Sequence, residues 1–323
     1  MSLPTIKLGL VGGISHTAMP LLNALIRQQR LQLMEVYDSR LAAAKENAQH
    51  LHATYSQSLD GLLRRCQGVV FGEVNWMGNV PILRSTGLQR PSLVLQSVYS
   101  RYRLTELLEL QSAAREHRCL VMPELSYRWA RSTLRLRELT ATQAGAIEYL
   151  EFQCHGEVGT ASELLAHDWC CNVMQSECRS VVVDSDTGAI TLKFRRMNRD
   201  GEPVTARILF HAGDHLGDFS SSSAMITCRH GNIRLSGDDK ISWDILGKKS
   251  TETLNRDRTA HDVMFDLFGR RLVGGLVPVP EIADLIKAHE IHQAVIKSRE
   301  LQTEVIVDHS LSRPSQDVAR PES

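Results

Sequence analysis

The stretch Ile6-Lys7-Leu8-Gly9-Leu10-Val11-Gly12-Gly13-Ile14-Ser15 is an apolar run that ends on two adjacent glycines. A helical pattern follows from Pro20 to Ile26, and a second apolar run from Leu31 to Tyr37 ends on Asp38. This order predicts a strand, a turn, a helix and a second strand that ends in an acid. In a dinucleotide-binding fold the glycines let the backbone approach the pyrophosphate, the helix N-terminus attracts its charge, and the acid receives the ribose hydroxyls.

The glycine pattern of this turn is incomplete. A full G-x-G-x-x-G motif would begin at Gly12, but Ile14 and Thr17 occupy its second and third glycine positions. Gly12-Gly13 still gives a turn without side chains, and Asp38 follows at the spacing of roughly 20 residues expected for the ribose acid. The alternative interpretation is an ordinary strand-to-helix turn that binds nothing.

Composition limits the classes of function. Lys+Arg and Asp+Glu are equal at 37, so no overall positive charge favours a nucleic acid or an anionic membrane as partner. The seven cysteines include Cys154, Cys170, Cys171 and Cys178, but no C-x-x-C spacing, which favours reduced, buried thiols over a metal site. No signal peptide or long apolar span is found, and we expect a soluble, cytoplasmic protein.

The chain length of 323 residues suits two domains. Residues 1–125 alternate short apolar strands with helices, which predicts a parallel sheet covered on both faces, with a binding crevice at the carboxyl ends of its strands. In residues 126–307, short strands separated by turns predict an α+β domain on a large, mostly antiparallel open sheet. Residues 308–323 are polar and read as a flexible tail.

Several segments along the chain resemble those of one known protein family. The region of Gly9, Gly12 and Asp38, Asn75 after a strand, Ser126-Tyr127-Arg128-Trp129, and the closing helix and strand over 288–307 resemble the glucose-fructose oxidoreductase, inositol dehydrogenase and rhizopine catabolism (Gfo/Idh/MocA) family. The resemblance spans residues 5–307 and implies a Rossmann domain followed by an α+β domain. It assigns the cofactor to a set of ten residues: Gly9, Gly12, Gly13, Ile14, Ser15, Asp38, Ser39, Arg40, Asn75 and Gln96.

The sequence departs from this family at Leu95-Gln96-Ser97-Val98. The family usually has Glu-Lys-Pro here, and its lysine hydrogen-bonds the reacting hydroxyl of the substrate. Ser97 stands at that position and donates a hydrogen bond without a charge. Gly78 also replaces a histidine that is usual in the family.

A second catalytic element of the family is matched by Glu163-Leu164-Leu165-Ala166-His167. Side chains four residues apart on a helix share one face, so Glu163 and His167 are expected to lie together. The resemblance makes His167 the general acid or base, and Glu163 either its orienting partner or a ligand of a substrate hydroxyl. It makes Tyr127, Arg128 and Asp168 candidate substrate-binding residues. Without the resemblance, His167 is one of 13 histidines and most simply a packed helix residue. The basic run from Arg128 to Arg137 is interpreted as a solvated helix face with one or two acid contacts, although Arg128 matches a pocket-lining position of the family.

These observations leave two hypotheses. The first is an NAD(P)-dependent oxidoreductase that transfers a hydride between the nicotinamide and a small polar substrate such as a sugar, a cyclitol or a related carbonyl or imine compound. Asp38 favours NAD because a carboxylate repels a 2′-phosphate, whereas Arg40 next to it leaves NADP open. The second is a diverged, non-catalytic relative that binds a ligand or a protein partner. Family members pair through the open sheet, which implies a homodimer or homotetramer, and no metal is expected.

Overall fold

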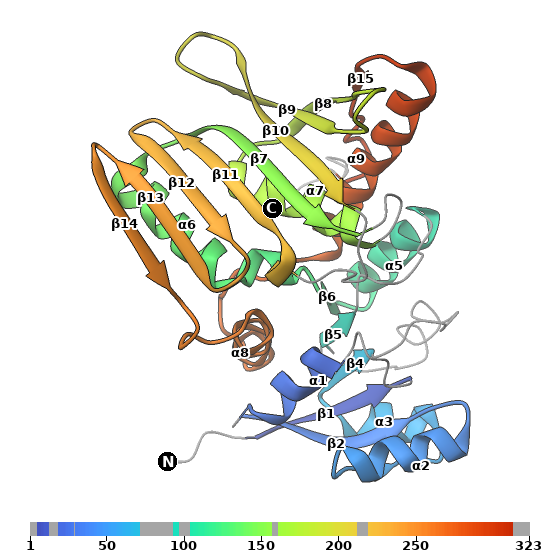
Figure 1. Ribbon diagram of the computed structural model, residues 1–323. Helices are drawn as coiled ribbons and strands as arrows, with labels where there is room; N and C mark the ends of the chain where they lie inside the picture. The colour runs from blue at the N-terminus through green and yellow to red at the C-terminus, as the bar shows by residue number, and fades with distance from the viewer. Residues whose placement is uncertain are drawn as a thin grey trace, which may run out of the picture.

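The computed structural model describes residues 5–12, 19–28, 30–71, 93–96, 104–156, 161–211 and 219–312. Within these residues the chain builds two sheets, one in the N-terminal third and one in the remainder (Figure 1). The helix expected near residues 80–86 lies outside the described residues.

The first sheet has six parallel strands in the order β3-β2-β1-β4-β5-β6. This is the strand order of a dinucleotide-binding fold, whose ligand crevice lies where the order reverses between β1 and β4. The expected Rossmann sheet is therefore confirmed. Its strands are β1 (Ile6–Val11), β2 (Leu31–Tyr37), β3 (Thr54–Tyr55), β4 (Gly68–Phe71), β5 (Leu93–Gln96) and β6 (Leu120–Pro123).

Helices connect these strands at the positions that the sequence pattern predicts. They are α1 (Met19–Ile26), α2 (Leu41–His50), α3 (Leu59–Arg65) and α5 (Leu104–Glu116). Helix α3 begins at Ser58, whose hydroxyl accepts a hydrogen bond from the Gly61 amide at 3.1 Å. Leu8 and Leu10 of β1 are fully buried beneath these helices, so β1 lies at the centre of the domain.

The second sheet has nine strands in the order β14-β13-β12-β11-β7-β10-β9-β8-β15. Only β7 and β10 pair in parallel among the described strands, so the expected mostly antiparallel sheet is also confirmed. Its strands are β7 (Ile147–His155), β8 (Cys178–Val183), β9 (Ile190–Met197), β10 (Pro203–His211), β11 (Ser223–Cys228), β12 (Gly231–Ser236), β13 (Lys240–Ile245), β14 (Lys248–Thr253) and β15 (Val305–Ile306). The sequence Lys-Lys-Ser-Thr-Glu-Thr of β14 has no apolar residue, so hydrophobic patterning does not predict it.

Helices cover one face of this sheet (Figure 1). They are η1 (Ser126–Trp129), α6 (Arg131–Leu139), η2 (Thr140–Ala144), α7 (Ala161–Met174) and α9 (Ile282–Leu301). Trp169 of α7 is fully buried, packs against Phe152 of β7 with ring centroids 4.4 Å apart, and donates a hydrogen bond to Thr133 at 2.9 Å. Trp169 is thus a core residue.

Helix α8 (Ala260–Leu272) returns to the N-terminal domain although it lies late in the sequence. Its buried Met264, Phe265 and Phe268 belong to the same apolar cluster as Leu8 and Leu10 of β1. Arg27, after α1, donates hydrogen bonds to the Asp262 carboxylate at 3.0 and 3.2 Å. The two domains are therefore joined by a shared core as well as by the chain. The predicted boundary at residue 125 stays a prediction.

The basic run is not a solvated face, and that prediction is wrong. The side chains of Arg128, Arg131 and Arg135 retain only 13, 15 and 22% exposure, and each pairs with an acid from another element. The partners are Asp168 of α7, Asp238 between β12 and β13, and Glu252 of β14. These acids are 40 to 117 residues away, so no local pattern indicates that they cover the arginines.

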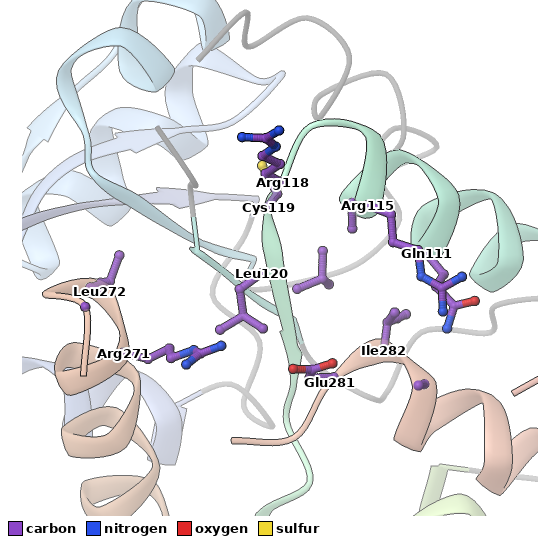
Figure 2. Close-up of a pocket in the computed structure, with 13 residues that line it drawn as sticks. Gln111, Arg115, Arg118, Cys119, Leu120, Arg271, Leu272, Glu281 and Ile282 are labelled. Atoms are coloured by element: carbon purple, nitrogen blue, oxygen red, sulfur yellow. The ribbon is translucent and has the colours of Figure 1, made fainter. Parts of the chain in front are cut away.

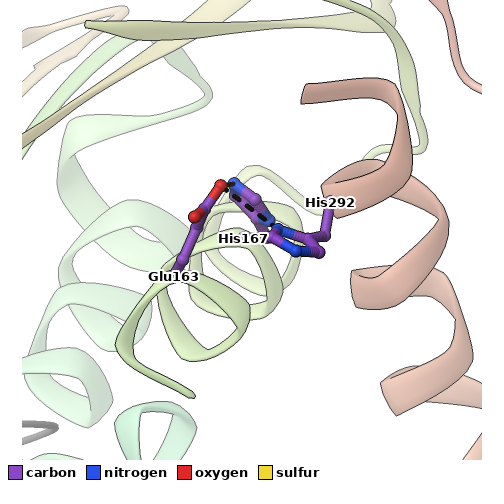
Figure 3. A group of neighbouring side chains, drawn as sticks. All are labelled: Glu163, His167 and His292. Carbon is purple, nitrogen blue, oxygen red and sulfur yellow. Dashed lines mark ion pairs between the residues drawn. The ribbon is translucent and has the colours of Figure 1, made fainter. Parts of the chain in front are cut away.

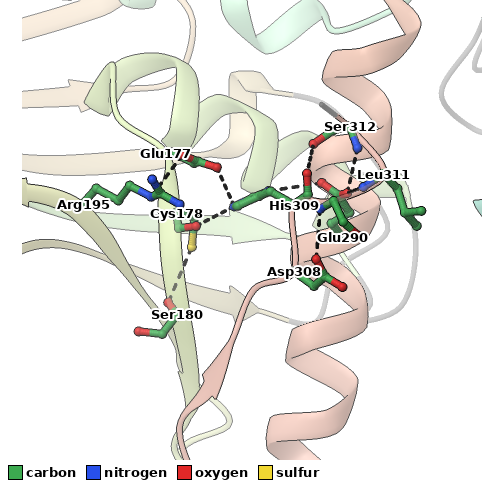
Figure 4. Close-up of polar contacts among 10 residues, drawn as sticks. Glu177, Cys178, Ser180, Arg195, Glu290, Asp308, His309, Leu311 and Ser312 are labelled. Atoms are coloured by element: carbon green, nitrogen blue, oxygen red, sulfur yellow. Dashed lines mark hydrogen bonds and ion pairs between the residues drawn. The ribbon is translucent and has the colours of Figure 1, made fainter. Parts of the chain in front are cut away.

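The first residues of the predicted tail, 308–312, are held against α9 (Figure 4). The buried Glu290 carboxylate accepts hydrogen bonds from the backbone amides of Leu311 and Ser312 at 3.1 and 3.0 Å, and lies 3.1 Å from His309 Nδ1. His309 Nε2 lies 2.6 Å from the Cys178 carbonyl, which ties this segment to β8. Residues 313–323 lie outside the described residues.

This cluster predicts a pH dependence of stability. Burial lowers the pKa of His309, but contacts with Glu290, the Cys178 carbonyl and the charge of Glu177 outweigh it, so the pKa is raised above its ordinary value of 6.5. A raised pKa in the folded state stabilises the fold fully below the unfolded pKa, and this contribution is lost as the pH rises through the folded pKa. We expect the free energy of unfolding to fall as the pH rises above about 6.5, the pKa of an unperturbed histidine, and through the higher pKa of the folded state.

Urea unfolding of the wild type and of His309→Gln at several pH values measures this. The variant should have a flatter pH profile over the same range, because Gln does not titrate. Equal slopes for the two proteins would assign the dependence to other groups.

Among the described residues, no helix combines the length and the apolar character that crossing a membrane requires. All seven cysteines are free thiols and five of them are buried, as expected.

Candidate functional site

The carboxyl ends of β1 and β2 form the first part of the candidate site. Gly12 ends β1 with φ of +93°, a conformation that side chains disfavour, and its amide donates to the Tyr37 carbonyl at 2.9 Å. Asp38 follows β2 and is only 8% exposed. Its Oδ1 accepts a hydrogen bond from the Arg40 amide at 2.8 Å, which fixes the carboxylate at the end of the strand.

Arg40 and Ser39 lie beside this acid on the surface. The Arg40 side chain is 77% exposed, and its Nε lies 3.7 Å from Asp38 Oδ1. This exposed guanidinium lies two residues from the acid, close enough to contact either a ribose or a phosphate bound there. The geometry of this corner therefore agrees with a nucleotide ribose bound at Asp38.

Gly9 has a packing reason to be glycine. A Cβ at this position would lie 2.4 Å from Cδ2 of Leu62 on α3, too close for any real contact. Gly9 thus allows α3 to pack closely on β1. Gly13, Ile14, Ser15, Asn75 and Ser97 lie outside the described residues. Gln96 is the last residue of β5, opposite Phe71 and Pro123, and its side chain is not described.

The second part of the candidate site is a buried cluster between α7 and α9 (Figure 3). The spacing of four residues places Glu163 Oε1 3.7 Å from His167 Nε2, as the helical pattern predicts. Neither side chain has exposed area. Two residues of α9 complete the cluster: His292, whose Nδ1 lies 3.3 Å from Glu163 Oε1, and Arg299, whose guanidinium lies 3.7 Å from the same oxygen.

Burial determines the protonation of His167. Its removal from water lowers the pKa to about 4, and the neighbouring charges of His292 and Arg299 act in the same direction. The Glu163 charge and a backbone contact with Ala288 oppose this shift without cancelling it. The ring is therefore neutral at pH 7, with a lone pair on one nitrogen that can accept a proton or bind a metal ion.

His292 and Arg299 are not predicted from the sequence. They lie seven residues apart, which is two turns of α9 and hence one face of the helix. That spacing was visible, but nothing in the sequence indicated that this face of α9 contacts α7 at Glu163.

The candidate substrate residues are joined to one another. Arg128 donates to the Asp168 carboxylate, with Nε at 2.8 Å, and its guanidinium also lies 3.3 Å from Asp284 at the start of α9. Burial alone would lower the pKa of Arg128, but the two carboxylates raise it. Burial raises the pKa of Asp168 against the effect of Arg128. Tyr127 is 1% exposed and packs edge-on against Phe219 at 4.9 Å.

Two cavities lie near these elements. One of about 500 Å³ is lined by Arg128, Asp168, Asp284 and Lys287, so the buried ion pair borders this cavity. The other, of about 470 Å³, is lined by residues of α5, β6, the end of α8 and the segment between α8 and α9, including Arg115, Arg271 and Glu281 (Figure 2). It lies at the amino end of β6, where Cys119 and Leu120 line it, opposite the edge at which a dinucleotide binds.

Comparisons with known proteins place this architecture. No protein-family model and no curated protein sequence matches the chain. Solved structures match it over nearly its full length. An oxidoreductase from Sinorhizobium meliloti has a TM-score of 0.77 at 14% identity, with 94% of this chain and 100% of that chain covered. The chain has the fold of Gfo/Idh/MocA-type dehydrogenases.

Two further structures show how widely this fold is used. The WlbA dehydrogenase from Chromobacterium violaceum, solved in complex with NADH and UDP-GlcNAcA, has a TM-score of 0.70 at 15% identity, with 95% of this chain and 97% of that chain covered. A super-repressor mutant of Gal80p from Saccharomyces cerevisiae has a TM-score of 0.77 at 15% identity, with 96 and 100% covered. At such identities the likeness concerns the fold alone.

Proposed function

We propose that the protein is an NAD(P)-dependent oxidoreductase that transfers a hydride between the nicotinamide and a small polar substrate, such as a sugar, a cyclitol or a related carbonyl or imine compound. The observation that carries this proposal is the corner formed by Gly12 and Asp38. A left-handed glycine ends β1 and a fixed carboxylate ends β2, next to the point where the strand order reverses. The NADH complex of WlbA, a protein of the same fold, supports the class of cofactor.

NAD is the proposed cofactor, with NADP as second choice. The Asp38 carboxylate would accept hydrogen bonds from the ribose hydroxyls and repel a 2′-phosphate. Arg40 is exposed and is the group that would hold such a phosphate. The relative affinity of the protein for NADH and NADPH shows whether Asp38 or Arg40 determines the choice of cofactor.

For proton transfer we propose His167, oriented by Glu163, with Ser97 as a hydrogen-bond donor to the substrate. His167 and Glu163 are within 3.7 Å of each other. The ring would take up or release the proton that accompanies hydride transfer. Tyr127, Arg128 and Asp168 are proposed to shape the substrate side, with the ion pair of Arg128 and Asp168 bordering the 500 Å³ cavity.

Titration with NADH and NADPH tests the cofactor proposal. The purified protein should bind NADH in calorimetry, and Asp38→Ala should weaken this about 10- to 100-fold, since hydrogen bonds to a charged group contribute about 1.5–3 kcal/mol. Asp60→Ala is the matched control, because Asp60 lies on α3 and pairs with Arg64 at the surface. Equal losses in both variants, or no binding by the wild type, would reject the dinucleotide site.

A second candidate function is a non-catalytic protein that binds a nucleotide or another ligand. It is favoured by the complete burial of Glu163 and His167 and by their contacts with α9, which close the pair off from solvent. The same fold occurs in Gal80p, whose solved structure is that of a super-repressor mutant, and this agrees with a regulatory role for a protein of this fold. NADH binding without turnover of any sugar, cyclitol, aldehyde or imine in a broad panel would support this candidate over the enzyme.

We further propose that two or four copies assemble through the open face of the nine-stranded sheet in the cytoplasm. Tyr149 and Met225 are exposed apolar residues on strands of this sheet, and free cysteines are typical of a reducing compartment. Light scattering measures the assembly, and a monomer at micromolar concentration would reject it.

A further inference from the structure

We propose that Glu163, His167 and His292 form a binding site for one divalent transition-metal ion, with Zn²⁺ as the best fit. The three donor atoms are Glu163 Oε1, His167 Nε2 and His292 Nδ1, drawn together in Figure 3. Among the described residues, this is the group of His, Cys, Asp and Glu side chains whose donor atoms converge closely enough to hold a metal, all within 4.8 Å of one another. The proposal goes beyond the oxidoreductase function and does not depend on it.

The distances suit tetrahedral coordination. Zn²⁺ binds nitrogen and carboxylate oxygen at about 2.0–2.1 Å, which keeps ligand atoms of a tetrahedron about 3.3 Å apart. Glu163 Oε1 is 3.3 Å from His292 Nδ1 and 3.7 Å from His167 Nε2. The two distances to the carboxylate are thus within a few tenths of an ångström of the tetrahedral spacing, and all three donor atoms lie within 4.8 Å of one another, so the two imidazoles would move toward each other when the ion binds. Two histidines and one carboxylate are a known zinc ligand set that leaves a fourth position for water.

The two imidazoles contribute buried nitrogens that lie near the Glu163 carboxylate but form no hydrogen bond of normal geometry within the part of the chain that the structure describes. Three buried ring nitrogens have no hydrogen-bond partner of normal geometry among the described residues: Nδ1 and Nε2 of His167, and Nδ1 of His292. A buried polar nitrogen without a partner is costly, whereas metal ligation would satisfy it. His292 keeps 15% of its side chain exposed, so the cluster lies next to the protein surface on the side of α9.

Arg299 decides how tightly the ion binds. Its guanidinium lies 3.7 Å from Glu163 Oε1 and supplies the positive charge that this carboxylate faces without metal. A dication would compete with it for the same oxygen. The Arg299 side chain is 29% exposed, so it has room to move toward solvent when the ion enters. Replacing Arg299 by Gln should therefore tighten metal binding, by about tenfold or more.

Metal binding and proton transfer use the same lone pairs of His167. A bound ion would hold the ring as a ligand, and the proposed catalytic role of His167 would then be exercised only by metal-free protein. The two proposals are separable, because metal binding is measured without nucleotide or substrate.

The experiment starts from full-length protein freed of metal with a chelator. Zn²⁺ titrated by calorimetry should bind with a stoichiometry of one, and Co²⁺ should give the intense visible absorption of a tetrahedral site. His292→Ala and Glu163→Gln should each weaken Zn²⁺ binding at least about tenfold, and Arg299→Gln should strengthen it. His289→Ala is the matched control, since His289 lies one turn from His292 on α9 and outside the ligand set.

Circular dichroism and thermal unfolding of each variant verify that the fold is kept. Zn²⁺ binding that is unchanged in His292→Ala and Glu163→Gln would overturn the proposal, as would the lack of stoichiometric binding by both the wild type and Arg299→Gln. Loss of Zn²⁺ binding in His289→Ala to the same degree as in His292→Ala would also overturn it.

Discussion

Replacing Arg128 by Met is expected to lower the free energy of unfolding by about 3–5 kcal/mol. Arg128 is 13% exposed and holds Asp168, whose side chain is 3% exposed, together with Asp284. Met keeps most of the volume of Arg but removes its charge, so Asp168 would remain buried without a partner. Breaking a buried ion pair on one side is costly for this reason, even where the intact pair contributes little net stability.

Urea unfolding of three variants measures this effect. The double variant Arg128→Met/Asp168→Asn should recover a large part of the loss, because no buried charge is then left alone. Arg64→Met is the control, since Arg64 is 79% exposed and its pair with Asp60 contributes less than about 1 kcal/mol. A double variant as unstable as Arg128→Met would show that the stability comes from packing of the Arg128 side chain and not from its charge.

The second large effect concerns turnover. In metal-free protein, with whichever panel substrate is turned over, His167→Ala is expected to lower kcat about 10²- to 10⁴-fold, the range for loss of a general acid or base. The Kd for NADH should not change, because His167 lies on α7 and Asp38 on the other domain.

The kcat is measured from the absorbance of NADH in stopped-flow experiments, with His289→Ala as the control variant. Because His167 is fully buried, its loss also leaves a cavity, so the midpoint of thermal unfolding is compared as well. A kcat that falls in parallel with stability in both histidine variants would indicate a structural role, and an unchanged kcat would remove His167 from the mechanism.

Much of the fold follows from local patterns. The apolar runs that form β1, β2, β4 and β6 are bounded by glycines, polar residues and helical segments. Each strand is therefore predicted from a window of about ten residues around it. The contact between Glu163 and His167 is equally local, because four residues on a helix fix their distance whatever surrounds them. β14 escaped prediction since its pairing with β13, and not its own side chains, makes it a strand.

By itself, the sequence determined the two-domain architecture, the acid at the end of β2 and the paired Glu163 and His167, because these depend on periodicity and spacing along a single segment. The tertiary structure alone decided what those groups face. Arg128, Arg131 and Arg135 look solvated in the sequence and are neutralised by acids on α7, on a turn and on β14. The meeting of His292 and Arg299 with Glu163 was likewise set by the packing of α9 against α7, and long-range packing of this kind leaves no periodic trace in either helix.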